Sequence, residues 1–158
     1  MVKLTQKERL LLEDQKKHEE VCIQKYTNYA GQAQDPELKQ LFKDYAAQEQ
    51  QHWNTINQML NGQVPNLQGQ QNQRNTQAAA GQVSQAALQG TMADQNDAAL
   101  CNDLLMTEKY VSGTYDTAIF EFTDTNMRQA LNHIQKEEQQ HGEGIFKYMQ
   151  SRGMYKPK

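Results

Sequence analysis

The feature that most constrains this chain is an internal repeat with an offset of 89 residues. Without a gap, the offset aligns Glu49-Gln50-Gln51-His52 with Glu138-Gln139-Gln140-His141, and it aligns Glu19 with Glu108. Each half therefore contains a glutamate followed, 30 residues later, by a Glu-x-x-His motif. A single Glu-x-x-His is common, but two copies at a matched distance from a matched glutamate indicate that the two halves form the same structural unit.

Helix start and stop signals divide each half into two helices. Thr5 and Glu8 form a capping-box pattern, and Asp35-Pro36-Glu37 places an N-cap residue before a first-turn proline and an acid. Because the connection within each half is short, its two helices are expected to be antiparallel neighbours. The expected helices cover residues 5–31, 35–61, 94–122 and 124–152.

A long polar link separates the halves. Residues 62–97 include ten Gln and four Asn but no aromatic residue, so they cannot form a core of their own. A helix of about 27 residues is about 40 Å long, which an extended link of this length can span. The prediction is an all-α, ferritin-like four-helix bundle in one domain, residues 1–158. It has a Gln-rich crossover at 62–93 and an internal pseudo-two-fold repeat.

The glutamates of the repeat lie on the apolar faces of the expected helices. Glu49 and His52 share a face with Leu38, Phe42 and Ile56. The other motif and the glutamates at 19 and 108 lie on similar stripes. A stripe at this spacing faces the core, so all four glutamates are expected to be buried in the middle of the bundle.

Four buried carboxylates repel one another and need compensating charge. Two divalent cations supply it, with the histidines as neutral ligands, because Glu and His three residues apart lie on one helix face. Glu19 and Glu108 would then bridge or cap the pair. Mixed carboxylate and imidazole ligands favour Fe or Mn. The predicted metal ligands are Glu19, Glu49, His52, Glu108, Glu138 and His141.

Other interpretations of these residues stay open. The same glutamates and histidines could form a buried hydrogen-bonded network with protonated carboxyl groups and no metal. Tyr26 and Tyr115, which the offset also aligns, are either core aromatics hydrogen-bonded near the site or redox tyrosines. No catalytic residue is assigned. His18, His133 and Glu137 are expected at the surface or behind the ligands, and Tyr45 and Trp53 in ordinary packing.

Composition excludes several function classes. A net charge of -3 and a pI near 5.8 do not suggest the basic face that nucleic acid or an anionic membrane requires. No apolar run reaches the roughly 18 residues of a membrane span, and the N-terminus lacks a signal-peptide pattern. Cys22 and Cys101 form no Cys-x-x-Cys motif and are expected to be buried thiols. Synthesis in the cytoplasm, without secretion, is therefore expected.

Three segments cover most of the chain outside the link: LTQKERLLLED near the N-terminus, KYTNYAGQAQDPELKQLFKDYAAQEQQH in the first half, and KYVSGTYDTAIFEFTDTNMRQALNHIQKEEQQHGEGIFKYM in the second. Together these segments resemble the coat F family of spore coat proteins. It implies a place in the ferritin-like superfamily and a final location in the spore coat. It also implies other coat proteins or further copies of the chain as partners.

Wider relatives bear on the chemistry. Lys25-Tyr26-Thr27 is similar to the first helix of rubrerythrins, but the chain lacks their Cys-x-x-Cys domain and has Val111 where they place a further glutamate. The symmetric ligand set is closer to that of bacterioferritin-type centres. Three functions follow as hypotheses. They are a structural or protective coat component with a metal site, a catalase-, peroxidase- or ferroxidase-like enzyme acting on peroxide or dioxygen, and a metal-stabilised interaction domain without turnover.

Overall fold

The computed structural model describes residues 1–67 and 95–156, and the regular secondary structure in these ranges is entirely α-helical. It consists of α1 (Gln6–Gln32), α2 (Pro36–Leu60), α4 (Gln95–Glu121) and α5 (Thr125–Ser151). The prediction of an all-helical chain with four helices is confirmed for these ranges. Residues 68–93 of the expected crossover, which the sequence predicts at 62–93, lie outside the described ranges. No described helix is long and apolar enough to cross a bilayer.

Side-chain caps fix the starts of three helices. At α1, Thr5 Oγ1 accepts the Glu8 N–H at 3.1 Å, and Glu8 Oε2 accepts the Thr5 N–H at 2.7 Å, so the expected capping box is present. Asp35 accepts the Glu37 N–H at 3.0 Å before α2. Asp124 caps α5 in the same way. These acceptors satisfy backbone donors that have no partner within the first turn of a helix.

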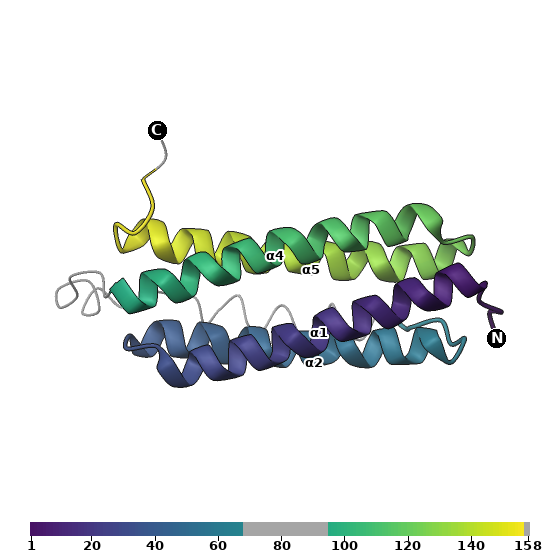
Figure 1. The fold of residues 1–158 in the computed structure, drawn as a ribbon, viewed down its shortest axis with the longest axis horizontal. Coiled ribbons are helices and arrows are strands. Elements are labelled where there is room, and N and C mark those ends of the chain that lie inside the picture. The colour runs from purple at the N-terminus through teal and green to yellow at the C-terminus, as the bar shows by residue number, and fades with distance from the viewer. Residues whose placement is uncertain (68–94, 157–158) are drawn as a thin grey trace.

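The four helices form two hairpins that lie side by side along the long axis of the molecule (Figure 1). Three-residue connections, at 33–35 and 122–124, join α1 to α2 and α4 to α5. Across the hairpins, α1 packs on α4 and α2 packs on α5. The side chains that reach across the bundle therefore do so along these two pairs of helices.

Each hairpin connection is held by an acidic residue from the opposite hairpin. Asp97 in α4 accepts the N–H groups of Gln34 and Asp35 at 2.9 and 3.1 Å. Glu8 in α1 accepts the N–H of Thr123 at 2.8 Å. Glu8 and Asp97 are 89 residues apart, and so are Gln34 and Thr123. The repeat in the sequence is thus also a repeat of contacts across the two hairpins.

The apolar core is divided into two clusters. The two Glu-x-x-His motifs and Glu108 occupy the helical turns between them, and Glu19 lies on α1 between Leu12 and Cys22 of the first cluster. Cys22 lies in one cluster and Cys101 in the other, and both are buried free thiols, as expected. The polar middle of the bundle is therefore closed by apolar packing at both ends. The first cluster contains Leu12, Cys22, Ile56, Met59, Val111, Tyr115, Ala118, Phe122, Met127, Ala130, Leu131 and Ile134. The second contains Tyr26, Ala30, Ala33, Leu38, Phe42, Leu100, Cys101, Leu104, Ile145, Tyr148 and Met149.

Candidate metal centre

The structure brings all six predicted ligands together in the middle of the bundle. Each is at most 2% exposed. They form two groups, and within each group one potential ligand atom per residue lies within 4.8 Å of the others. One group consists of Glu19, Glu49, His52 and Glu138, and the other of Glu49, Glu108, Glu138 and His141. The arrangement could hold two neighbouring ions.

Glu49 and Glu138, the glutamates of the two Glu-x-x-His motifs, belong to both groups. Glu19 and Glu108 belong to one group each. The sequence left open whether Glu19 and Glu108 would bridge or cap a pair of ions. In this geometry the motif glutamates occupy the shared positions, so Glu19 and Glu108 are placed to cap.

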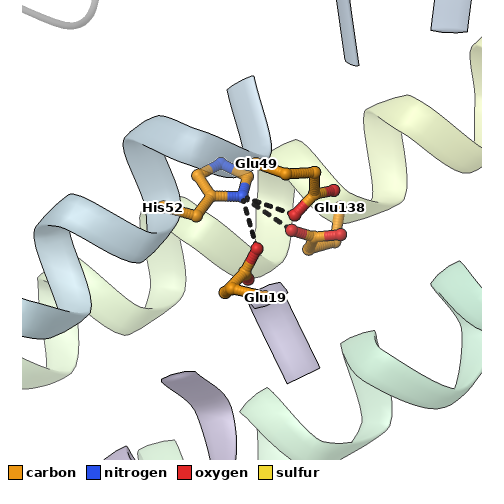
Figure 2. A group of neighbouring side chains, drawn as sticks. All are labelled: Glu19, Glu49, His52 and Glu138. Atoms are coloured by element: carbon orange, nitrogen blue, oxygen red, sulfur yellow. Dashed lines mark hydrogen bonds and ion pairs between the residues drawn. The ribbon is translucent and has the colours of Figure 1, made fainter. Parts of the chain in front are cut away.

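The first group is arranged around one ring nitrogen of His52 (Figure 2). Nδ1 of His52 lies 2.7 Å from Oε1 of Glu138 and 3.3 Å from Oε2 of Glu49. Oε2 of Glu19 lies 3.7 Å from the same nitrogen. Three carboxyl groups from three different helices thus gather around one nitrogen, so the four side chains together could hold one cation.

The second group repeats this pattern around His141. Nδ1 of His141 lies 2.9 Å from Oε1 of Glu49, 3.4 Å from Oε1 of Glu108 and 3.9 Å from Oε2 of Glu138. The rings of His52 and His141 are stacked with centroids 5.8 Å apart. The ring of Tyr45 also stacks on that of His141, with the two ring centroids 4.2 Å apart. Tyr45 therefore contacts the centre directly and is not only a packing residue.

Nε2 is the ring nitrogen of each histidine that points away from the cluster of carboxyl groups. In each case it faces the residue just before the Glu-x-x-His motif of the other hairpin. Nε2 of His141 donates to Oε1 of Gln48 at 2.5 Å. Nε2 of His52 lies 3.5 Å from Oε2 of Glu137, and Glu137 also makes a close ion pair with His133. These contacts direct the two Nδ1 atoms toward the carboxylates, because the partner of one ring nitrogen fixes the orientation of the other.

Of the three flanking residues considered in the sequence, Glu137 and His133 therefore stand behind a ligand. His18 instead lies half-buried between α1 and α4, against Tyr110 and Thr114 of α4. The role of Gln48 was missed. The signal was present in the repeat, because Gln48 and Glu137 are aligned by the same 89-residue offset and each directly precedes a motif glutamate.

Two tyrosines hold the capping glutamates from the opposite hairpin. Tyr26 in α1 donates to Oε1 of Glu108 at 2.6 Å, and Tyr115 in α4 donates to Oε1 of Glu19 at 2.5 Å. Both tyrosines are fully buried. They are thus core aromatics hydrogen-bonded to the site, one of the two interpretations that the sequence allowed.

The shared glutamates resist ionisation. Burial, together with the charges of Glu19 and Glu108, raises the pKa of Glu49 well above its usual value. Burial and the charges of Glu108 and Glu49 do the same to the pKa of Glu138. Since four carboxylates at this distance cannot all keep their charge at low cost, the two that lie between the others are the ones that favour the neutral form.

The capping glutamates behave in the opposite way. Burial opposes ionisation of Glu108, but hydrogen bonds with Glu138, His141 and Tyr26 outweigh it and lower the pKa of Glu108 to about 2. The pKa of Glu19 is also lowered, since contacts with Glu49, His52 and Tyr115 outweigh its burial. Burial alone would lower the pKa of His52, but Glu137 and Glu138 raise it well above its usual value.

The donor set fits two divalent cations. Among the described residues, Oε2 of Glu19, of Glu108 and of Glu138 is buried without a hydrogen-bond partner. Buried acceptors without partners are costly and rare, so three in one place point to a positively charged ligand. Metal–ligand bonds of about 2.0–2.2 Å place opposite ligand atoms about 4 Å apart, which matches the spread of each group.

A surface cavity of about 500 Å³ reaches the centre between α4 and α5. Its lining includes the buried residues Glu108 and Glu138 together with the exposed residues Lys109, Gly113 and Asp116. The cavity therefore comes close to the centre on this side, while the side chains of Glu108 and Glu138 stay buried beneath it.

Comparison with known proteins gives one match. The family described as the Coat F domain matches residues 96–158, which comprise nearly all of α4, all of α5 and the tail that follows. No curated protein and no solved structure matches the chain. The match covers less than half of the chain and leaves the first hairpin outside it. It thus supports similarity to spore coat proteins of the coat F type through the second hairpin.

Proposed function

We propose that this protein is a ferritin-like bundle of the spore coat that binds two Fe or Mn ions in its core and has a structural or protective role in the spore. One observation carries the metal-binding part of the proposal. Four buried glutamates and two buried histidines form two overlapping groups, and three of the carboxylate oxygens have no hydrogen-bond partner among the described residues. Two divalent cations would neutralise the four carboxylates.

The coat location is supported by the Coat F match of the second hairpin. Partners would be other coat proteins or further copies of this chain. The ferritin-like assignment is supported by the ligand pattern, in which two helices give one Glu each and the other two give a Glu-x-x-His each. A direct test of the location is detection of the protein in coat extracts of spores with an antibody.

In this proposal, Glu19 and His52 hold one ion and Glu108 and His141 hold the other, while Glu49 and Glu138 contact both. Tyr26 and Tyr115 keep the capping carboxylates in place, and Gln48 and Glu137 orient the histidines. The carboxylate and imidazole donors suit Fe or Mn better than the thiolate-rich sets of structural zinc sites.

A second function, redox chemistry on peroxide or dioxygen, is favoured by the cavity between α4 and α5. A purely structural centre needs no access from solvent, whereas this cavity brings solvent next to the buried residues Glu108 and Glu138. A bound pair of Fe or Mn ions would supply a two-electron change to such a reactant. The chain itself contributes buried carboxylates, two tyrosine hydrogen bonds and apolar walls that limit water.

The test is metal analysis of the purified full-length chain after loading with Fe(II) or Mn(II) without oxygen. We expect two ions per chain by mass spectrometry, and loss of most of the metal in Glu49→Gln, because Glu49 is shared by both groups. Glu143→Gln is the matched control, since Glu143 is exposed on α5 and forms an ion pair with the exposed Lys147.

The metal-free network makes the opposite prediction. If the glutamates and histidines only hydrogen-bond to one another, the wild-type chain retains no metal, and a chelator leaves its melting temperature unchanged. That result would reject the proposed centre. With two ions bound, a peroxide-consumption assay then separates the two functions. Turnover that disappears in Glu49→Gln favours the enzyme, and stoichiometric metal without turnover favours the structural role.

A further inference from the structure

The two hairpins differ at one pair of repeat positions next to the centre. Gly142 in α5 lines the cavity between α4 and α5. The residue 89 positions earlier is Trp53 in α2. Trp53 is half-buried and fixed against α1, because its Nε1 donates to Oε1 of Glu20 at 3.2 Å and the ammonium of Lys16 lies 4.8 Å from its ring centroid. At this repeat position, the first hairpin thus carries the largest side chain and the second carries no side chain.

Further repeat positions of the cavity differ in the same sense. Ser112 and Gly113 line the cavity, whereas their counterparts in α1 are the larger Ile23 and Gln24. On the first hairpin, the three equivalent positions therefore carry an indole and two longer side chains. On the second, the cavity lies next to the buried Glu108 and Glu138.

From this asymmetry we infer that the cavity at Gly142 is the route by which divalent cations reach the centre, and that Trp53 closes the equivalent route between α1 and α2. The inference rests on the proposed metal centre and adds the side of the bundle from which cations reach it. Cations that approach between α4 and α5 meet Asp116 at the rim and then Glu108 and Glu138 at the floor. Lys109 is the one basic residue among those that line the cavity.

The space around Gly142 makes the inference testable. A Cβ atom at this position would lie 3.8 Å from Cδ1 of Leu105 and 4.0 Å from Cβ of Glu108, which is ordinary van der Waals contact. Alanine therefore fits without displacing a neighbour. A tryptophan at the same position would place its indole in the cavity next to Glu108 and Leu105 and would occupy part of the cavity.

The experiment follows uptake of Co(II), a spectroscopically visible and redox-stable cation, by the metal-free full-length chain in a stopped-flow spectrometer. We expect Gly142→Trp to slow uptake by about tenfold or more, equivalent to about 1.4 kcal/mol of barrier, with an unchanged final number of ions. Gly142→Ala is the matched control and should load at close to the wild-type rate. Trp53→Ala should load faster than the wild type, because it opens the second route.

The double variant Gly142→Trp/Trp53→Ala separates access from a general disturbance of the fold. If Trp53 closes an equivalent route, its removal restores fast uptake when Gly142 is blocked. Wild-type uptake rates in both Gly142→Trp and Trp53→Ala would overturn the inference while leaving the centre intact. Should Gly142→Trp fail to fold by circular dichroism, an unchanged rate in Trp53→Ala alone overturns it. A wild-type chain that takes up no Co(II) would instead reject the metal centre.

Discussion

Gln48 and Glu137 lie 89 residues apart, and each faces the histidine of the opposite hairpin. Oε1 of Gln48 is 2.5 Å from Nε2 of His141, and Oε2 of Glu137 is 3.5 Å from Nε2 of His52. The two halves of the centre thus have the same types of candidate ligand. They differ in the residue that contacts Nε2 of the histidine. One histidine is oriented by a neutral amide and the other by a carboxylate, so the two proposed ion positions are chemically inequivalent.

Glu137→Gln should weaken one of the two ion positions. A carboxylate behind a ligating imidazole makes it a stronger ligand, and loss of such a partner typically costs about 10–100-fold in metal affinity. We expect that the ion bound by His52 is weakened while the other is little changed, as measured by competition titration with a chelator. Glu143→Gln, an exposed change of the same type on α5, is the control. Equal weakening of both ions would contradict the assignment.

Glu8→Gln should destabilise the fold by about 1–2 kcal/mol at neutral pH, because Glu8 both completes a capping box and accepts the Thr123 N–H from the other hairpin. Chemical unfolding measures the loss. Glu13→Gln, an exposed change on the same helix, should have little effect.

The effect of Glu8 should also depend on pH. Burial would raise the pKa of Glu8, but its hydrogen bonds with Thr123 and Thr5 outweigh burial and lower the pKa below 4.5. The unfolded chain then binds more protons than the folded one, so the contribution of Glu8 is present above its unfolded pKa and is lost as pH falls through the folded pKa. Wild type and Glu8→Gln should therefore converge in stability in acid. A constant difference at every pH would contradict the role of the charge.

Gly144→Ala should destabilise the protein although alanine favours helices. A Cβ atom at position 144 would lie 1.8 Å from the hydroxyl oxygen of Tyr45, so the tyrosine ring would have to leave its stacked position on His141. Gly142→Ala, two residues earlier, meets only ordinary contacts and should gain about 0.5–1 kcal/mol from helix propensity. Thermal unfolding of the two variants should move in opposite directions, and a shift in the same direction would count against the Tyr45 contact.

Tyr26→Phe and Tyr115→Phe should lower the free energy of unfolding of the metal-free protein by similar amounts. Each removes the hydroxyl donor of a buried capping carboxylate, which costs about 1–3 kcal/mol when the acceptor is left without a partner. Tyr110→Phe is the control, because Tyr110 is largely exposed. Urea unfolding measures all three. If only one of the two buried tyrosines mattered, the pseudo-two-fold arrangement would not extend to their energetics.

The sequence predicts which residues of one helix lie together in the centre, but it does not predict the contacts between helices. Helical spacing and the repeat place Glu49 and His52 on one buried face, because residues three apart on a helix share a side. The same pattern cannot say which residue of another helix stands opposite. That Tyr26 reaches Glu108 and not Glu19 depends on α1 packing beside α4, and this packing is a contact between segments far apart in the chain.

By itself, the sequence determined four helices, their caps at Thr5 and Asp35, and six residues of matching spacing on buried faces, since all of these follow from local backbone chemistry and periodicity. Only the tertiary structure decided that Glu49 and Glu138 occupy the shared positions, that Gln48 and Glu137 stand behind the histidines of the opposite hairpin, and that the cavity opens at Gly142. Those features depend on how two hairpins of nearly the same pattern face each other. The relative placement of helices far apart in the chain is set by packing, which local patterns do not encode.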